Sequence, residues 1–240
     1  MKENLWIVVG ATSAIAEAFA RMTAAEGAPL LLVARNIERL KVLQADIRLR
    51  YKTPCDILAC DLAKDSTPLL HAIENLPGEV FLFLAQGLVL DNNVLDKHTI
   101  DNMLAVNSAS VIHSVHTCLQ RAQNTQQIVF LSSVAGMRGR ARNSLYGGTK
   151  SAVEVYLQGL QQESVKNRHI TIARLGFIDT QNTFGLKGAA LAISPERAAR
   201  ACLHAIRHKK RMVYIPFFWR IIMGVIVWLP FWMFKRLWQL

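Results

Sequence analysis

The sequence predicts an α/β protein with a doubly wound parallel sheet of about seven strands, followed by an apolar helical tail. Short apolar runs alternate with stretches of helical period from residue 5 to residue 215. The runs lack the polar–apolar alternation of a half-exposed strand, which indicates strands buried on both faces. A turn that contains glycine follows the first run, as in sheets that bind dinucleotides.

The apolar runs and the periodic stretches define the expected elements in order. Strands are expected at 5–9, 30–34, 55–59, 80–85, 127–132, 170–175 and 212–215. Helices are expected at 13–26, 36–50, 66–75, 97–123, 144–166 and 195–209. The last of these has a clear start, with Ser194 as N-cap and Pro195 in the first turn. We therefore expect a dinucleotide-binding catalytic domain over 1–215 and a separate tail over 216–240.

Composition and charge favour a globular protein with a basic C-terminal end. The chain has 240 residues, of which 52% are hydrophobic and 19% are charged, so it can fill a core. Its four cysteines form no CxxC pair and lie near no suitably spaced histidine, so we expect free thiols and no metal site. Of the net charge of +11, nine cations lie between Arg197 and Leu240, where there is no acidic residue. This end also holds four of the five tryptophans, a mixture that favours a lipid surface over nucleic acid.

The segment "GATSAIA", residues 10–16, follows the first expected strand and opens the first helix. Backbone N–H groups at a helix N-terminus attract phosphate oxygens. Gly10 permits the tight turn, and Thr12 and Ser13 add hydroxyl donors. Ala14 and Ala16 stand where such turns often carry glycine. An ordinary strand–helix turn remains the alternative on this motif alone.

The ends of the next two strands bear on the choice of cofactor. Ala34 leaves no acid to bind a ribose 2′-hydroxyl, and Arg35 suits a 2′-phosphate. This predicts NADP, with NAD still possible. A solvated charge is the alternative for Arg35. Asp61 closes the third strand and is expected either to bind the adenine amino group or to cap a helix.

Ser133, Tyr146 and Lys150 form the candidate catalytic set. Ser133 ends a strand, and Tyr146 and Lys150 are four residues apart, so they share one face of a helix. A nearby ammonium is expected to lower the pKa of the phenol, which makes it a proton donor near neutral pH. Ser133 is expected to hydrogen-bond the oxygen of a carbonyl or hydroxyl substrate.

At this point residues 5–215 resemble the short-chain dehydrogenase/reductase family, whose fold is Rossmann-type. The resemblance implies the catalytic triad above, with Asn107 in "AVNSAS" supporting a proton-relay water, and it implies a homo-oligomer. It also implies a set of cofactor-contacting residues: Gly10, Thr12, Ser13, Ile15, Arg35, Asp61, Leu62, Ala85, Gly87, Tyr146, Lys150, Ile178 and Thr180. The chain departs from the family pattern at Leu175, where a proline is usual, and in "LAQG" at 84–87, where asparagines are usual.

Three arginines, Arg138, Arg140 and Arg142, lie between Ser133 and Tyr146. In this topology the segment borders the mouth of the substrate site, so a substrate that carries a phosphate is one hypothesis. Solvated loop charges are the alternative.

The tail is rich in large apolar residues. Its apolar run from Ile221 to Phe234 has 14 residues, short of the ~20 that span a bilayer, and it contains Pro230. The sequence "RHKKR" at 207–211 lies just before it. These features predict an element that lies in the membrane interface through residues 207–240, on the cytoplasmic face of a membrane. A pair of dimerisation helices or a short tilted span are the alternatives.

Triad, turn and tail together resemble the decaprenylphosphoryl-2-keto-pentose (polyprenyl-phosphate sugar) reductases. The implied activity is NAD(P)-dependent reduction of a carbonyl, or oxidation of a hydroxyl, on a membrane-resident substrate. Other lipid carbonyls, of the 3-ketoacyl or ketosphinganine type, are alternatives. So is a catalytically idle membrane adaptor that binds the nucleotide.

Overall fold

The structure, a computed structural model, describes residues 4–180 and 191–237. Its single sheet has seven parallel strands in the order β3-β2-β1-β4-β5-β6-β7. The strands are β1 Leu5–Val9, β2 Leu30–Ala34, β3 Cys55–Ala59, β4 Val80–Leu84, β5 Gln126–Ser133, β6 Arg168–Leu175 and β7 Met212–Ile215. The helices are α1 Ala14–Ala25, α2 Ile37–Tyr51, α3 Thr67–Asn75, α4 Lys97–Leu104, α5 Ser110–Leu119, α6 Ser144–Gln162, α7 Pro195–Arg207, α8 Trp219–Trp228 and α9 Phe231–Phe234. The predicted doubly wound sheet is confirmed.

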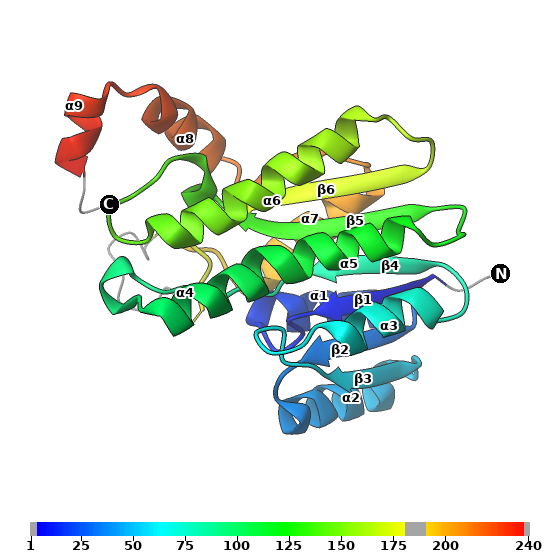
Figure 1. The fold of residues 1–240 in the computed structure, drawn as a ribbon. Helices are drawn as coiled ribbons and strands as arrows, with labels where there is room; N and C mark the ends of the chain where they lie inside the picture. Colours follow the sequence, from blue (N-terminus) through cyan, green and yellow to red (C-terminus); the bar gives the residue numbers. More distant parts are fainter. Residues whose placement is uncertain (1–3, 181–190, 238–240) are drawn as a thin grey trace.

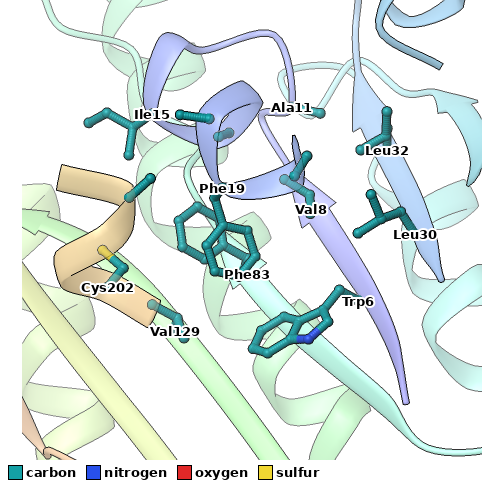
Figure 2. Packing of buried hydrophobic residues seen from close by; sticks show 14 of the residues in the cluster. Trp6, Val8, Ala11, Ile15, Phe19, Leu30, Leu32, Phe83, Val129 and Cys202 are labelled. Carbon is teal, nitrogen blue, oxygen red and sulfur yellow. The ribbon is translucent and has the colours of Figure 1, made fainter. Parts of the chain in front are cut away.

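Helices cover both faces of the sheet, which explains why its strands are apolar throughout (Figure 1). Helices α1, α2 and α7 pack on one face, and α3, α5 and α6 on the other. On the first face Phe19 stacks on Phe83 with ring centroids 3.7 Å apart, and Trp6 meets Phe19 edge-on (Figure 2). Two cores therefore hold the strands in fixed register.

The strand order places the functional residues at one edge of the sheet. All strands are parallel, so their carboxyl ends lie together, and the order reverses between β1 and β4. Ligands of such sheets bind in the crevice outside that reversal point. The segments that follow β1, β4, β5 and β6 all reach this edge.

Two helices end differently from the prediction. The expected helix 97–123 is divided into α4, a π turn at Ala105–Ala109, and α5. The expected helix 144–166 ends at Gln162, and Ser164 and Asn167 then adopt positive φ values of 51° and 62°. Positive φ in a non-glycine residue is incompatible with a continued right-handed helix.

The tail packs partly on the body instead of standing apart from it. Trp219 and Met223, one turn apart on α8, are buried against Val134. Among residues 4–180 and 191–237, none of the helices is long and apolar enough to cross a bilayer.

The basic segment 207–211 and the tail lie at opposite ends of β7. The segment precedes β7 and the tail follows it, so the length of a strand separates the two. The carbonyl groups of Lys210 and Arg211 accept hydrogen bonds from Thr171 and Ile172, at the middle of β6. Helices α8 and α9 lie beyond the carboxyl edge of the sheet (Figure 1).

Candidate active site

Ser133, Tyr146 and Lys150 meet at one cavity, as the spacing predicts. Ser133 is the last residue of β5, and Tyr146 and Lys150 lie in the first turns of α6. All three line a cavity of about 1080 Å³ at the carboxyl edge of the sheet. The Lys150 side chain is buried, and its Nζ donates to the carbonyl oxygens of Leu131 at 2.9 Å and Gln86 at 3.4 Å.

Burial is the largest cause of the pKa shift at both Lys150 and Tyr146. It lowers the pKa of Lys150 to about 8, while the negative charge of Glu154 opposes this change. Burial raises the pKa of Tyr146, against a hydrogen bond from Ser133 and the positive charge of Arg140, which both lower it. The expected lowering of this pKa by Lys150 is not found: burial outweighs the two groups that lower the pKa, and these are Ser133 and Arg140.

A buried network that the sequence analysis missed lies behind Lys150. Glu154, one turn along α6, accepts hydrogen bonds from Ser132 Oγ at 2.5 Å and from Arg174 Nη2 at 2.6 Å. Arg174 Nη1 in turn donates to the Tyr214 hydroxyl at 2.5 Å. The i, i+4 spacing of Lys150 and Glu154 could have predicted that these two side chains are neighbours on one helix. The contact with Arg174 could not be predicted from spacing, because Arg174 lies on β6.

Asn107 sits in the π turn between α4 and α5. Its Oδ1 accepts from the Leu88 N–H at 2.7 Å, and its Nδ2 donates to the Leu88 carbonyl at 2.9 Å and to Thr149 Oγ1 at 3.2 Å. Thr149 in turn donates to the Tyr146 carbonyl at 2.7 Å. The side chain thus ties the loop after β4 to α6, and it is not among the residues that line the catalytic cavity. π turns are frequent at functional sites.

The turn after β1 is tight and leads directly into α1. Gly10 adopts φ +75°, and a Cβ there would lie 2.8 Å from the backbone nitrogen of Gln86. Ser13 caps α1, whose N-terminus opens into the cavity beside Thr12 and Ala14. Ala14 is exposed, whereas Ala16 is buried in the core. The first alanine methyl therefore faces the ligand space, and the second serves helix–sheet packing.

A smaller cavity of about 270 Å³ continues from this turn and has the position of an adenosine site. Arg35, Leu62, Ala85 and Gly87 are among the residues that line it. Asp61 lines neither cavity: its carboxylate accepts from the Ala63 N–H at 3.2 Å and closes its own turn. That turn precedes α3, whose N-cap is a different residue, so Asp61 is neither placed at the adenine cavity nor a helix cap.

The larger cavity is lined by further cofactor candidates and by residues that the sequence analysis missed. Ile15, Ile178 and Thr180 line it, as the resemblance implies. Arg39 was not anticipated: it lines the cavity and its guanidinium donates to the Thr12 carbonyl at 2.8 Å. Trp219 also lines it, which nothing in the uniformly apolar tail sequence indicated.

The three arginines before Tyr146 have three different environments. Arg138 turns away and donates to carbonyls at the end of α8, and it does not line the cavity. Arg142 lines it but pairs with Asp91 at 2.8 Å. Arg140 lines it with a buried Nε that has no acceptor, and no carboxylate pairs with it in the described part of the chain. Burial lowers the pKa of Arg140. Of the three, only Arg140 presents an uncompensated charge to a ligand.

Comparison with known proteins places this arrangement in a family. Residues 4–188 match the family model described as short chain dehydrogenase. The chain is 30% identical over 240 residues to an uncharacterized oxidoreductase of Mycobacterium tuberculosis, covering 96% of each chain. It is 30% identical over 190 residues to a 3-oxoacyl-[acyl-carrier-protein] reductase of Bos taurus, covering 75% of this chain and 78% of the relative.

Solved structures share the fold. A short-chain dehydrogenase from Sphingobium yanoikuyae in complex with NADPH superposes with a TM-score of 0.81 at 21% identity, covering 92% of this chain and 93% of that one. The cavity with Ser133, Tyr146 and Lys150 at the carboxyl edge of a doubly wound sheet agrees with these matches. The chain therefore belongs to the short-chain dehydrogenase family and is an NAD(P)-dependent oxidoreductase.

Proposed function

We propose that the protein is an NADPH-dependent reductase of a carbonyl on a membrane-resident substrate that carries an anionic group. The observation that carries the proposal is the position of α8. One side of this helix contributes Trp219 to the catalytic cavity, and the other exposes Ile221, Val225 and Trp228. A substrate held in a lipid surface on the exposed side would thus lie near the cavity.

The residues present fit NADP as the cofactor. The helix N-terminus at Ser13 suits a pyrophosphate, and Gly10 permits the tight turn before it by its positive φ and by the close approach of the Gln86 backbone. Arg35 lines the adenosine cavity, where an arginine suits a 2′-phosphate. The related structure from Sphingobium yanoikuyae binds NADPH, which agrees with this choice. Bound NADPH would supply the hydride.

The chain's own residues then account for the proton and for the position of the carbonyl. Ser133 and Tyr146 hydroxyls hold the substrate oxygen by hydrogen bonds, and Tyr146 gives it a proton. The raised pKa of Tyr146 keeps the phenol protonated at neutral pH, in the form that donates. Lys150, fixed by two carbonyl oxygens at the wall of the same cavity, would stabilise by its charge the phenolate left by proton transfer. Asn107 supports this site by joining the loop after β4 to α6.

The exposed face of the tail supports membrane association. Its large apolar side chains are Phe217, Ile221, Val225, Val227, Trp228, Phe231, Trp232 and Met233. Exposed cations at Arg220, Lys235 and Arg236 flank them. An exposed apolar helix edged by tryptophan and cations is typical of an element that lies in the interface of an anionic membrane.

The substrate that fits best is a keto-sugar linked to a polyprenyl phosphate. Its prenyl chain would stay in the lipid, its carbonyl would reach Ser133 and Tyr146, and its phosphate would find a cation in Arg140. The experiment is oxidation of NADPH or NADH in the presence of a membrane lipid extract. We expect consumption with NADPH, and a KM for the extract that rises when Arg140 is replaced with Gln. If neither cofactor is consumed with any extract, the proposal is wrong.

The membrane part is tested separately by flotation with vesicles of phosphatidylcholine, with or without phosphatidylglycerol. Trp228→Glu with Trp232→Glu is expected to abolish flotation on the anionic vesicles. Val42→Glu and Val155→Glu, which alter exposed apolar residues elsewhere, are the matched controls. Flotation that survives the tail substitutions would contradict a membrane role for the tail.

Reduction of a 3-ketoacyl chain is the second candidate. The bovine relative, a 3-oxoacyl-[acyl-carrier-protein] reductase, favours it. This substrate would need no lipid surface, so activity on acetoacetyl thioesters that is unaffected by Trp228→Glu with Trp232→Glu would support it over the first.

A further inference from the structure

One polar group of the catalytic cavity comes from the tail. Trp219 lines the cavity together with Ser133 and Tyr146, and only 9% of its surface is exposed. Its indole Nε1 is buried and finds no acceptor in the residues that the structure describes. An unpaired buried donor is energetically costly, so one in a residue that lines a cavity points to an acceptor on a ligand.

Packing, and not a hydrogen bond, fixes the orientation of this indole. A Cβ at Gly176 would lie 1.9 Å from Nε1, so the ring occupies the space that any side chain at Gly176 would need. Phe177 meets the indole edge-on with ring centroids 5.5 Å apart, and Val134 and Met223 pack around it. The indole is therefore held in place by packing alone, and its buried N–H has no acceptor among the described residues.

The far end of α8 is fixed as well. Arg138 Nη1 donates to the carbonyl oxygens of Ile226, Val227 and Leu229, the last two at 3.1 Å and 2.8 Å. Its guanidinium also lies 3.9 Å from the centroid of the Phe234 ring. Since α8 is anchored at both ends, it forms a wall of the cavity and not a loosely attached appendage.

We propose that Trp219 determines substrate specificity, by donating its indole N–H to a second oxygen of the substrate. The reacting oxygen is the one that Ser133 and Tyr146 hold. This inference rests on the proposed carbonyl reduction but not on a lipid substrate. It predicts a preference for substrates with an acceptor oxygen near the carbonyl, a class that includes diketones, ketoacyl compounds and keto-sugars.

The test compares benzil with deoxybenzoin, two ketones of similar size, of which only benzil has the second carbonyl oxygen. For Trp219→Phe we expect kcat/KM with NADPH to fall about two- to tenfold on benzil, the loss of one neutral hydrogen bond, and to change little on deoxybenzoin. Trp228→Phe, on the same helix but exposed, is expected to change neither. Equal losses on both ketones would assign Trp219 a packing role and overturn the proposal.

The indole N–H resonance gives a second readout that does not need turnover or a mutant that folds well. In ¹⁵N-labelled wild type with NADP⁺ bound, benzil is expected to shift the Trp219 signal and to leave the Trp228 signal in place. A Trp219 signal that responds to NADP⁺ but not to benzil would assign the donor to the cofactor instead, and one that responds to neither would also refute the proposal. Failure of the wild type to reduce either ketone would count against carbonyl reduction, while the benzil titration still decides the role of Trp219.

Discussion

Replacing Lys150 with methionine is expected to stabilise the ligand-free protein at neutral pH while it abolishes catalysis. The pKa of Lys150 is about 8, against an ordinary value of 10.5. Since one pKa unit corresponds to about 1.36 kcal/mol, burial of this charge costs about 3 kcal/mol below pH 8. The variant also loses the two hydrogen bonds from Nζ to carbonyl oxygens, which lowers its free energy of unfolding by about 1–2 kcal/mol. The net gain in free energy of unfolding is therefore about 1–2 kcal/mol at pH 7.

The gain in free energy of unfolding depends on pH. Between pH 8 and pH 10.5 the unfolded chain holds the Lys150 proton more tightly than the folded chain, so rising pH stabilises the wild-type fold. The advantage of Lys150→Met is full below about pH 8, vanishes at about pH 9 to 9.5, and turns into a disadvantage of about 1–2 kcal/mol by about pH 10.5, because the two lost hydrogen bonds still count when the charge no longer does.

Urea unfolding of both proteins at pH 7, 8.5 and 9.5 measures this, and Lys64→Met, at an exposed lysine, controls for the loss of a charge. A difference in unfolding free energy that stays constant across this range would refute the reasoning, as would a less stable variant at pH 7.

Three further outcomes are expected. Gly10→Ala should lower both the melting temperature and NADPH affinity, because its Cβ meets Gln86 backbone. Gly27→Ala shares a positive φ but has open space around it, so an equal loss there would assign the effect to φ alone. Arg35→Asp should weaken NADPH binding about tenfold or more and spare NADH, as judged by dissociation constants; parallel losses would exclude contact with a 2′-phosphate. Arg138→Gln should speed proteolytic cleavage within 216–236, because α8 loses its anchor, whereas Arg142→Gln should not.

The sheet and the convergence of Ser133, Tyr146 and Lys150 on one cavity could be predicted because both depend on local patterns. Strands buried on both faces read as short apolar runs, and the structure places each within two residues of its expected ends. Ser133, Tyr146 and Lys150 carry a spacing that a helix translates directly into proximity.

The remaining features depend on contacts that sequence spacing does not record. In the tail nearly every residue is apolar, so the two that face the body, Trp219 and Met223, do not stand out from those that face outward. Arg138 looked equivalent to Arg140, but the last carbonyls of α8 attract it. The raised pKa of Tyr146 likewise reflects burial, which the neighbouring residues in sequence did not indicate.

The π turn at Ala105–Ala109 gives the helical segment from Lys97 to Leu119 the character of an α-helix with one residue inserted. Deleting a single residue there would restore regular i→i+4 bonding and remove the bulge that carries Asn107. Asn107 could then no longer face both Leu88 and Thr149. A one-codon deletion in this stretch is thus expected to give a more regular helix but a less active enzyme. Selection for stability would favour the deletion, and selection for activity would oppose it.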